Sequence, residues 1–310
     1  MKTTSKNILY LCLIGCLSFL WMSCNKEAAL TNSGYKEYGY IVPQGNHPYD
    51  QRIVNYYNKW GIAVLYNFTQ QDINWKISGY DATYKSVPAD TNYISNQLDL
   101  IDTTFFRFYQ DSTLKQYLPL KVFLCSSLMY LTTWVDAYGL NSTTSTTLGG
   151  YQSFPINWGS SRITHLGSGT ANDSAVVFRG NINFSFLKVA LINGTMVMSP
   201  NFAPYSDYTT ALVATNNAPR YKRGFLGVTS SYTSLPSAPS DWYYYIQAAV
   251  SNTYANLTST ATTSADATYK GILSSVKDSS GLINQKYNFV VNYYKTRYNI
   301  DLQKIGNGGR

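Results

Sequence analysis

The chain has 310 residues, of which 45% are hydrophobic and only 13% are charged, and it carries a formal net charge of +8. This length allows one large domain or two small ones, and the hydrophobic share excludes global disorder. The only glutamates are Glu27 and Glu37, and the only histidines are His47 and His165. This excludes three-histidine metal sites and any mechanism that needs a glutamate beyond residue 37.

The N-terminus has the pattern of a lipoprotein export signal. Lys2 and Lys6 precede an apolar run over 8–22, and Ser23 stands directly before Cys24. The run is too short for a transmembrane helix, so it predicts a leader that is removed in front of Cys24. The cysteine would then carry the lipid that anchors the chain to a membrane. An ordinary secretory leader, cut elsewhere, is the alternative.

These features divide the chain into three parts. We assign 1–23 to the signal peptide, 24–47 to the lipidated cysteine and a flexible polar tether, and 48–310 to a single domain. Past Cys24 only Cys125 remains, so the domain can hold neither an internal disulfide nor a cysteine zinc site, and this thiol in an apolar run is predicted to be buried. The basic residues are scattered along the chain, which does not favour nucleic acid as a partner.

The first half of the domain predicts helices followed by strands. A helix is expected over 50–60, capped by Asp50 and ended by Gly61, with an apolar face of Ile53, Tyr57 and Trp60. A buried strand is expected over 62–68 and a central strand over 120–131. Between them lies a second helix, whose apolar stripe at helical spacing consists of Ile94, Leu98, Ile101, Phe105 and Phe108.

The second half predicts helices separated by loops. Residues 137–175 and 200–239 have the Gly, Ser, Thr and Pro content of loops and short strands, with a short helix at 184–191 between them. A later helix is expected to start at 239–241 with Ser240 as its cap, and another to cover 265–277. The last helix carries an apolar stripe of Ile283, Tyr287, Val290, Tyr294 and Tyr298. Strands early and helices late indicate an α+β fold.

The residues contain no familiar catalytic motif. There is no H-x-x-x-H, no G-x-S-x-G and no G-x-x-x-x-G-K, so zincin, serine-hydrolase and phosphate-loop chemistry lack their usual signatures. The Asp residues show no spacing that selects an acid and base pair. His165 combined with an Asp or with Cys125 stays open as a rearranged hydrolytic site.

Aromatic residues are in surplus and suggest a binding role. The chain has 29 Tyr and 6 Trp, and such rings stack on sugar or peptide faces while amides and hydroxyls supply neutral hydrogen bonds. Dense clusters are Asn55-Tyr56-Tyr57, Trp242-Tyr243-Tyr244-Tyr245 and Asn292-Tyr293-Tyr294. Packing inside the core is the alternative role for the same tyrosines.

Three stretches together resemble the Bacteroidetes substrate-import-associated zinc metallohydrolase lipoproteins, a zinc-metallopeptidase-like family. They are residues 56–68, residues 223–227 with 240–242, and residues 292–302. They look like the family's opening helix and strand, its loop and helix with an acidic segment, and its closing helix. The resemblance implies a zincin-like single domain, anchored in the outer membrane on the periplasmic or the outer surface, beside a TonB-dependent importer and its substrate-binding lipoprotein.

The metal site that this resemblance implies is missing from the sequence. The family's zinc helix would fall on 182–188, where Phe184 and Lys188 replace the two histidines and Ser185 replaces the catalytic glutamate, and the downstream acid would fall near Tyr244. Phe has no lone pair for a metal, Ser is not a base at neutral pH, and a lysine cation repels Zn²⁺. We therefore expect no metal, no cofactor and no enzymatic activity.

The residues and the resemblance support three hypotheses. The first is a degenerate zincin that kept its fold and cleft, lost its metal, and binds a peptide or glycan as an accessory to nutrient import. Its candidate binding residues are Trp242, Tyr243, Tyr244, Lys188 and Asp241, with Asp241 as a conceivable partner of the Lys188 ammonium. The second is an active hydrolase with a rearranged site that uses Asp and His165. The third is a structural envelope lipoprotein.

Overall fold

The computed structural model describes residues 40–76, 79–80, 84–137, 153–166, 175–226 and 232–309. Residues 42–310 form one compact unit, and the fold below is that of this unit. The expected leader over 1–23, Cys24 and the tether up to residue 39 lie outside the described residues. Gln44, which the sequence places in the tether, accepts hydrogen bonds from the backbone N–H groups of Tyr66 and Asn67.

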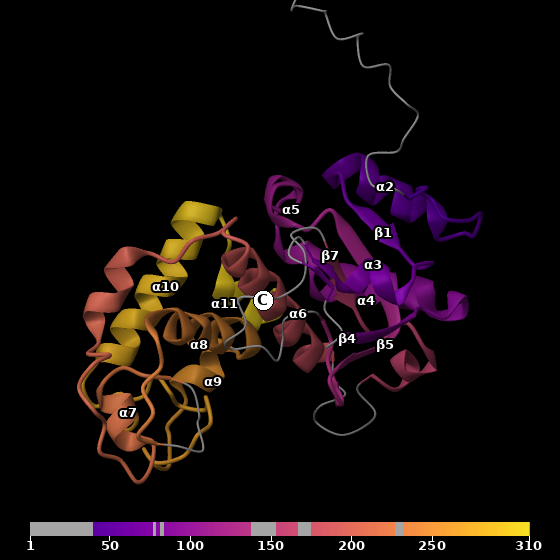
Figure 1. The fold of residues 1–310 in the computed structure, drawn as a ribbon. Coiled ribbons are helices and arrows are strands. Elements are labelled where there is room, and N and C mark those ends of the chain that lie inside the picture. The colour runs from indigo at the N-terminus through magenta and orange to yellow at the C-terminus, as the bar shows by residue number, and fades with distance from the viewer. Residues whose placement is uncertain are drawn as a thin grey trace, which may run out of the picture. The chain divides into compact units, whose positions relative to one another are not determined.

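Strands and short helices come first in the chain, and longer helices follow (Figure 1). The first half contains, in order, α2 (Asp50–Trp60), β1 (Ala63–Leu65), α3 (Gln70–Asn74), β2 (Trp75–Lys76), β3 (Gly79–Tyr80), β4 (Tyr84–Pro88), η1 (Thr91–Tyr93), α4 (Ile94–Thr104), η2 (Phe106–Phe108), α5 (Asp111–Tyr117), β5 (Lys121–Tyr130), β6 (Thr133–Trp134), β7 (Ser153–Ile156) and η3 (Ser161–His165). The second half contains α6 (Ala175–Ile192), η4 (Pro200–Tyr205), α7 (Ala218–Lys222), α8 (Ala238–Ser251), α9 (Tyr254–Thr258), α10 (Leu282–Tyr298) and α11 (Leu302–Gly306). The α+β class predicted from the sequence is therefore confirmed.

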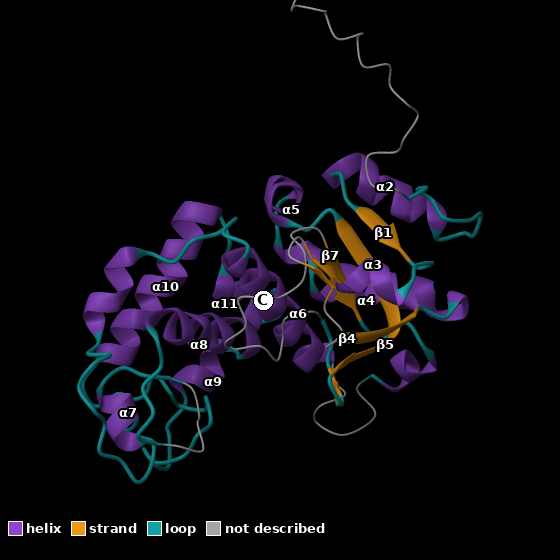
Figure 2. Ribbon diagram, viewed as in Figure 1, coloured by secondary structure: helices purple, strands orange, loops and turns teal. Residues whose placement is uncertain are grey.

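Strand β5 is the centre of the main sheet (Figure 2). Its first half pairs in parallel with β1 and β7, and its second half pairs antiparallel with β4 and β6. Its residues Val122, Phe123, Leu124 and Cys125 are buried. A strand covered on both faces has an apolar run instead of an alternating pattern, which is why the central strand and β1 could be predicted from the sequence.

Helix α6 connects the sheet with the later helices. The Phe186 ring lies 5.3 Å from Phe105 at the end of α4 and 6.4 Å from Phe154 of β7, measured between ring centroids. On its other side α6 packs against α8 and α11. By length and composition α6 could cross a membrane, yet 61% of it is buried inside the protein, as expected of a helix in the middle of a core.

Two predicted helices differ from the structure. The helix expected at 184–191 is α6, which has eighteen residues, and its start escaped prediction because a helix buried on most sides has no amphipathic stripe. The prediction of a helix at 265–277 is wrong, since these residues form turns and irregular structure. Gly271 there has a φ of +64°, a left-handed conformation that interrupts a helix. The Asp266 carboxylate also accepts the Thr268 backbone N–H at 2.9 Å, an alternative to helical bonding.

The caps of two correctly predicted helices also differ. Helix α8 begins at Ala238 with Ser237 as its cap, whose Oγ accepts the Ser240 N–H at 3.3 Å, so Ser240 is not the cap. In α2, Asp50 is the first helical residue, and its carboxylate accepts the His47 N–H at 2.7 Å. Ile53 and Trp60 of that helix are buried as predicted, but the third buried apolar side chain is Tyr56 and not Tyr57.

Candidate functional site

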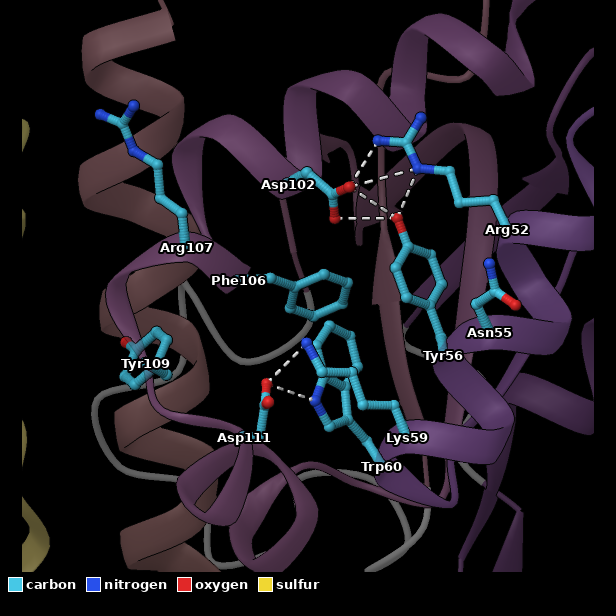
Figure 3. A pocket seen from close by; sticks show the side chains of 10 residues that line it. All are labelled: Arg52, Asn55, Tyr56, Lys59, Trp60, Asp102, Phe106, Arg107, Tyr109 and Asp111. Atoms are coloured by element: carbon cyan, nitrogen blue, oxygen red, sulfur yellow. Dashed lines mark hydrogen bonds and ion pairs between the residues drawn. The ribbon is translucent and has the colours of Figure 1, made fainter.

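A pocket of about 500 Å³ lies beside α2 (Figure 3). We call it the α2 pocket and define it by the residues that line it, which are Arg52, Asn55, Tyr56, Lys59, Trp60, Asp102, Phe106, Arg107, Tyr109 and Asp111. All of these residues come from helices or from the short segments that join them. The volume is in the range of pockets that hold small ligands.

One face of α2 supplies half of the lining. Its residues at positions 55, 56, 59 and 60 lie three, four, seven and eight residues after Arg52, so all five side chains point to the same side of the helix. Gly61 ends the helix in a left-handed conformation with a φ of 76°, and its N–H donates to the Tyr57 carbonyl. The opposite wall comes from the end of α4, from η2 and from the start of α5.

The base of the α2 pocket is aromatic. The rings of Tyr56 and Trp60 are stacked, with centroids 5.2 Å apart and an angle of 6° between their planes. Phe106 meets Trp60 edge-on at 4.7 Å. All three side chains are buried, so the rings form a rigid apolar base whose position depends on core packing and not on a mobile loop.

On one side of this base lies a hydrogen-bonded group of Arg52, Tyr56 and Asp102. Arg52 Nη2 donates to Asp102 Oδ2 at 2.6 Å, and Arg52 Nη1 donates to Asp99 at 2.6 Å. The Tyr56 hydroxyl donates to the Asp102 carboxylate at 2.8 Å. Burial, followed by the neighbouring Asp102 charge, raises the pKa of Tyr56 well above its usual value, so this hydroxyl stays a donor at neutral pH.

On the other side lies an ion pair of Lys59 and Asp111. Lys59 Nζ is 2.9 Å from Asp111 Oδ1, and the Trp60 Nε1–H donates to the same oxygen at 3.1 Å. The hydrogen bond from Lys59, and then that from Trp60, lowers the pKa of Asp111. Both side chains are more than half exposed, so this pair forms part of the rim.

The lining of the α2 pocket combines charged, polar and aromatic side chains. Among the described residues that line it there is no histidine, cysteine or serine, the residue types that usually supply the nucleophile and base in acyl-transfer chemistry. Both carboxylates of the lining have partners, because Asp102 accepts hydrogen bonds from Arg52 and Tyr56 and Asp111 pairs with Lys59. What the lining does offer is an apolar base with donors and acceptors at both ends.

The positions of the degenerate motif lie elsewhere, where α6 meets α8. Phe184, Ser185 and Lys188 are buried on α6, and the Ser185 Oγ has no hydrogen-bond partner among the described residues. Lys188 Nζ lies 5.8 Å from the centres of the Phe184 and Tyr243 rings. Burial lowers the pKa of Lys188 to about 8. The structure thus brings the α6 positions together with the α8 residues that precede Tyr244, which is itself half-buried.

Asp241 has a different partner from the one considered in the sequence analysis. Its carboxylate forms a fully buried ion pair with Lys286 of α10, not with Lys188. Trp242 is also fully buried, with its ring edge-on to Phe202 at 4.9 Å. With Lys188, three of the five candidate binding residues are therefore buried in the structure, while Tyr243 and Tyr244 are half-buried.

The two histidines and the cysteine lie in different segments of the fold. His47 stacks on Tyr49 with ring centroids 5.0 Å apart, and His165 lies in η3, where its Nδ1 is 3.3 Å from the Thr164 hydroxyl. Cys125 is fully buried, as predicted, and burial raises the pKa of its thiol. Within the part of the chain that the structure describes, no three His, Cys, Asp or Glu side chains form a group that could hold a metal ion.

Comparisons with known proteins give one structural similarity. No family model matches the chain, and no curated protein matches it. A solved structure described as a "putative zinc-binding metallo-peptidase" from Bacteroides caccae aligns with a TM-score of 0.47 and 14% identity, covering 83% of this chain and 87% of that chain. Of the family resemblance described above, the comparisons show only this similarity of fold. A similarity of this size gives no evidence about function.

Proposed function

We propose that the chain is a non-catalytic lipoprotein of the outer membrane that binds a glycan in the α2 pocket, as an accessory to nutrient import. The observation that carries the proposal is the set of charged side chains arranged around the aromatic base, with Arg52 and Asp102 on one side and Lys59 and Asp111 on the other. Sugar hydroxyls both donate and accept, so they can bond to both members of such a pair at once.

A glycan fits this lining better than a peptide does. One common way to bind an extended peptide is to add it as a strand to an open sheet edge, whereas the α2 pocket is lined by side chains from helices and the segments between them. Arg52 and Lys59 also each have a carboxylate partner already. Paired charges of this kind favour a ligand rich in neutral hydroxyl groups.

The experiment compares two aspartates that share one arginine. Asp102 lines the α2 pocket and Asp99 does not, yet both bind Arg52. Glycan binding to the protein without its leader is measured by calorimetry for the parent, Asp102→Asn and Asp99→Asn. Loss of a charged hydrogen bond to the ligand costs about 1.5–3 kcal/mol, so D102N should weaken binding roughly ten- to hundredfold and D99N far less. Equal effects, or no glycan binding by the parent, would refute the proposal.

Catalysis is tested on the same variants. Turnover of a glycoside or of casein that is lost in Asp102→Asn, Asp111→Asn or His165→Ala would establish the hydrolase hypothesis instead. We expect no turnover by the parent, because the carboxylates of the α2 pocket are already engaged by Arg52, Tyr56, Lys59 and Trp60.

The membrane anchor is part of the same proposal and rests on the sequence around Cys24. In cells fed labelled palmitate, we expect Cys24→Ser to lose the label and to leave the membrane fraction. Cys16→Ser, inside the leader, is the matched control and should keep both. Co-purification of the parent with an importer in the outer membrane would support the accessory role, and labelling that persists in C24S would contradict the anchor.

A further inference from the structure

Two arginines from distant parts of the chain lie against the same stretch of backbone. Arg107 Nη2 in η2 donates to the Gly308 carbonyl at 2.7 Å, and Arg179 Nη2 in α6 donates to the Gly306 carbonyl at 2.9 Å. A β-carbon built on Gly308 would lie 2.7 Å from Arg179 Nη1, and one on Gly309 would lie 3.5 Å from Arg107 Nη2. The two guanidinium groups therefore flank one glycine-rich turn.

Neither arginine has an acidic partner among the residues that the structure describes. The ion pairs found there involve Arg52, Lys59, Arg223, Lys277, Lys286 and Lys295, but neither of these two arginines. Within the described part of the chain, the buried Nε of Arg179 has no hydrogen-bond partner. Burial, and then the neighbouring Arg107 charge, lowers the pKa of Arg179. Two like charges and an unpaired donor at one place are unfavourable, and a bound anion would relieve both.

This arginine pair is connected to the α2 pocket, because Arg107 is one of the residues that line it. The other two cations of the lining are balanced, Arg52 by Asp99 and Asp102, and Lys59 by Asp111. The wall formed by Arg107 is therefore where the described lining carries excess positive charge. A planar guanidinium binds carboxylate and sulfate oxygens through two parallel hydrogen bonds.

We infer that Arg107 and Arg179 bind an anionic group, a carboxylate or a sulfate ester, on the glycan held in the α2 pocket. The inference rests on the proposed function and adds the substrate class, which is an acidic polysaccharide. The neutral part of the sugar lies over the Tyr56 and Trp60 base, and its acidic substituent extends past Arg107 toward Arg179.

The test uses three oligosaccharide probes and three arginine variants. Calorimetry measures binding of an oligogalacturonate, its carboxyl-reduced neutral counterpart and a sulfated galactan to the protein without its leader. The variants are Arg107→Gln, Arg179→Gln and the control Arg297→Gln, an exposed arginine of α10 outside the lining. We expect R107Q and R179Q each to weaken the acidic probe about tenfold or more, with little change for the neutral one, as for loss of a charge-assisted hydrogen bond. R297Q should behave like the parent.

The outcomes separate the inference from the proposed function. A loss confined to the galacturonate identifies a uronate and a loss confined to the sulfated galactan identifies a sulfate ester, and both support the inference. Equal binding of acidic and neutral probes, or equal weakening of all probes in R107Q and R179Q, overturns it while leaving glycan binding intact. Should R179Q not fold, the exposed Arg107 decides alone.

Inorganic sulfate tests the arginine pair without any glycan. We expect sodium sulfate to raise the Tm of the parent above its value in sodium chloride of equal ionic strength, and to raise that of R107Q by less, because only a bound anion stabilises through this pair. An equal rise in both proteins overturns the inference, even where no oligosaccharide binds and the proposed function has failed.

Discussion

Lys286 and Asp241 show how a buried charge pair can be held in an aromatic core. Lys286 Nζ also donates to Ser206 Oγ and to the Gly224 carbonyl, each at 2.8 Å, and it lies 4.8 Å from the centre of the Phe202 ring. Burial raises the pKa of Asp241 and lowers that of Lys286. Each charge is thus stable only because the other is present.

We predict that Lys286→Met strongly destabilises the fold. The variant leaves Asp241 buried without its cation, and breaking a buried pair in this way costs about 3–5 kcal/mol. Urea unfolding followed by circular dichroism measures the change in the free energy of unfolding. Lys295→Met on the same helix is the control, because Lys295 is exposed and lies 3.8 Å from Asp301. Equal losses of unfolding free energy in the two variants would show that the buried ion pair contributes no more to stability than the exposed one.

The free energy that the folded protein loses by burying the charged Lys188 amine should depend on pH. Burial lowers its pKa from 10.5 to about 8. Below pH 8 the folded protein bears the cost of the buried charge, and between pH 8 and 10.5 the unfolded chain binds more protons than the folded one. The contribution of Lys188 to stability therefore rises with pH through this window.

We predict that Lys188→Met is more stable than the parent at pH 7, by up to roughly 3 kcal/mol at about 1.4 kcal/mol per pH unit of that window. The difference should shrink toward zero by pH 10.5, and chemical unfolding across this pH range measures it. Leu187→Met, a neutral change at the neighbouring buried position, should give a difference that does not vary with pH. A flat difference for K188M would contradict the cost of the buried charge.

At the scale of elements, helix packing depends on close backbone approach as well as on apolar stripes. Where α6 crosses α8, a β-carbon on Gly180 would lie 2.9 Å from the Ser251 Cα and 2.7 Å from its Oγ. Gly180 has an ordinary helical φ, so it is required by the neighbouring backbone and not by its own conformation. The α4 and α10 stripes were visible in the sequence, whereas this crossing point was not.

We predict that Gly180→Ala destabilises the protein although alanine is the better helix former. Overpacking of this kind costs about 1–3 kcal/mol, which outweighs the gain of ~1 kcal/mol in helix propensity. Val176→Ala, at an exposed position of the same helix, should change the Tm little. Thermal unfolding distinguishes the two, and a Tm for G180A at or above that of the parent would mean that the helices simply move apart.

At the scale of the whole molecule, the predicted loss of the metal site can be measured directly. We predict that the purified protein, washed with chelator, contains far less than one zinc ion per chain. The zinc-helix positions hold Phe184, Ser185 and Lys188, none of which ligates zinc in the way His and Glu do. Elemental analysis before and after incubation with zinc checks this. Zinc bound in one-to-one ratio after washing would end the degenerate-zincin hypothesis.

The sequence by itself determined those features that depend on local pattern. Helical spacing of apolar residues predicted α4 and α10, an unbroken apolar run predicted β5, and Gly61 predicted the end of α2. The small number of Glu and His residues limits which metal sites and catalytic motifs the chain can contain. These signals are read within a few turns of helix or one strand, so they need no knowledge of distant neighbours.

The tertiary structure alone decided which residues meet. The α2 pocket joins residues 52–60 with residues 102–111, and the arginine pair joins positions 107 and 179. The sequence suggested Lys188 as the partner of Asp241, and only the packing of α10 against α8 shows that the partner is Lys286. Side chains far apart in the sequence can act together only when the packed core brings them close in space. The physical reason is that burial and charge pairing both depend on the distance between the side chains.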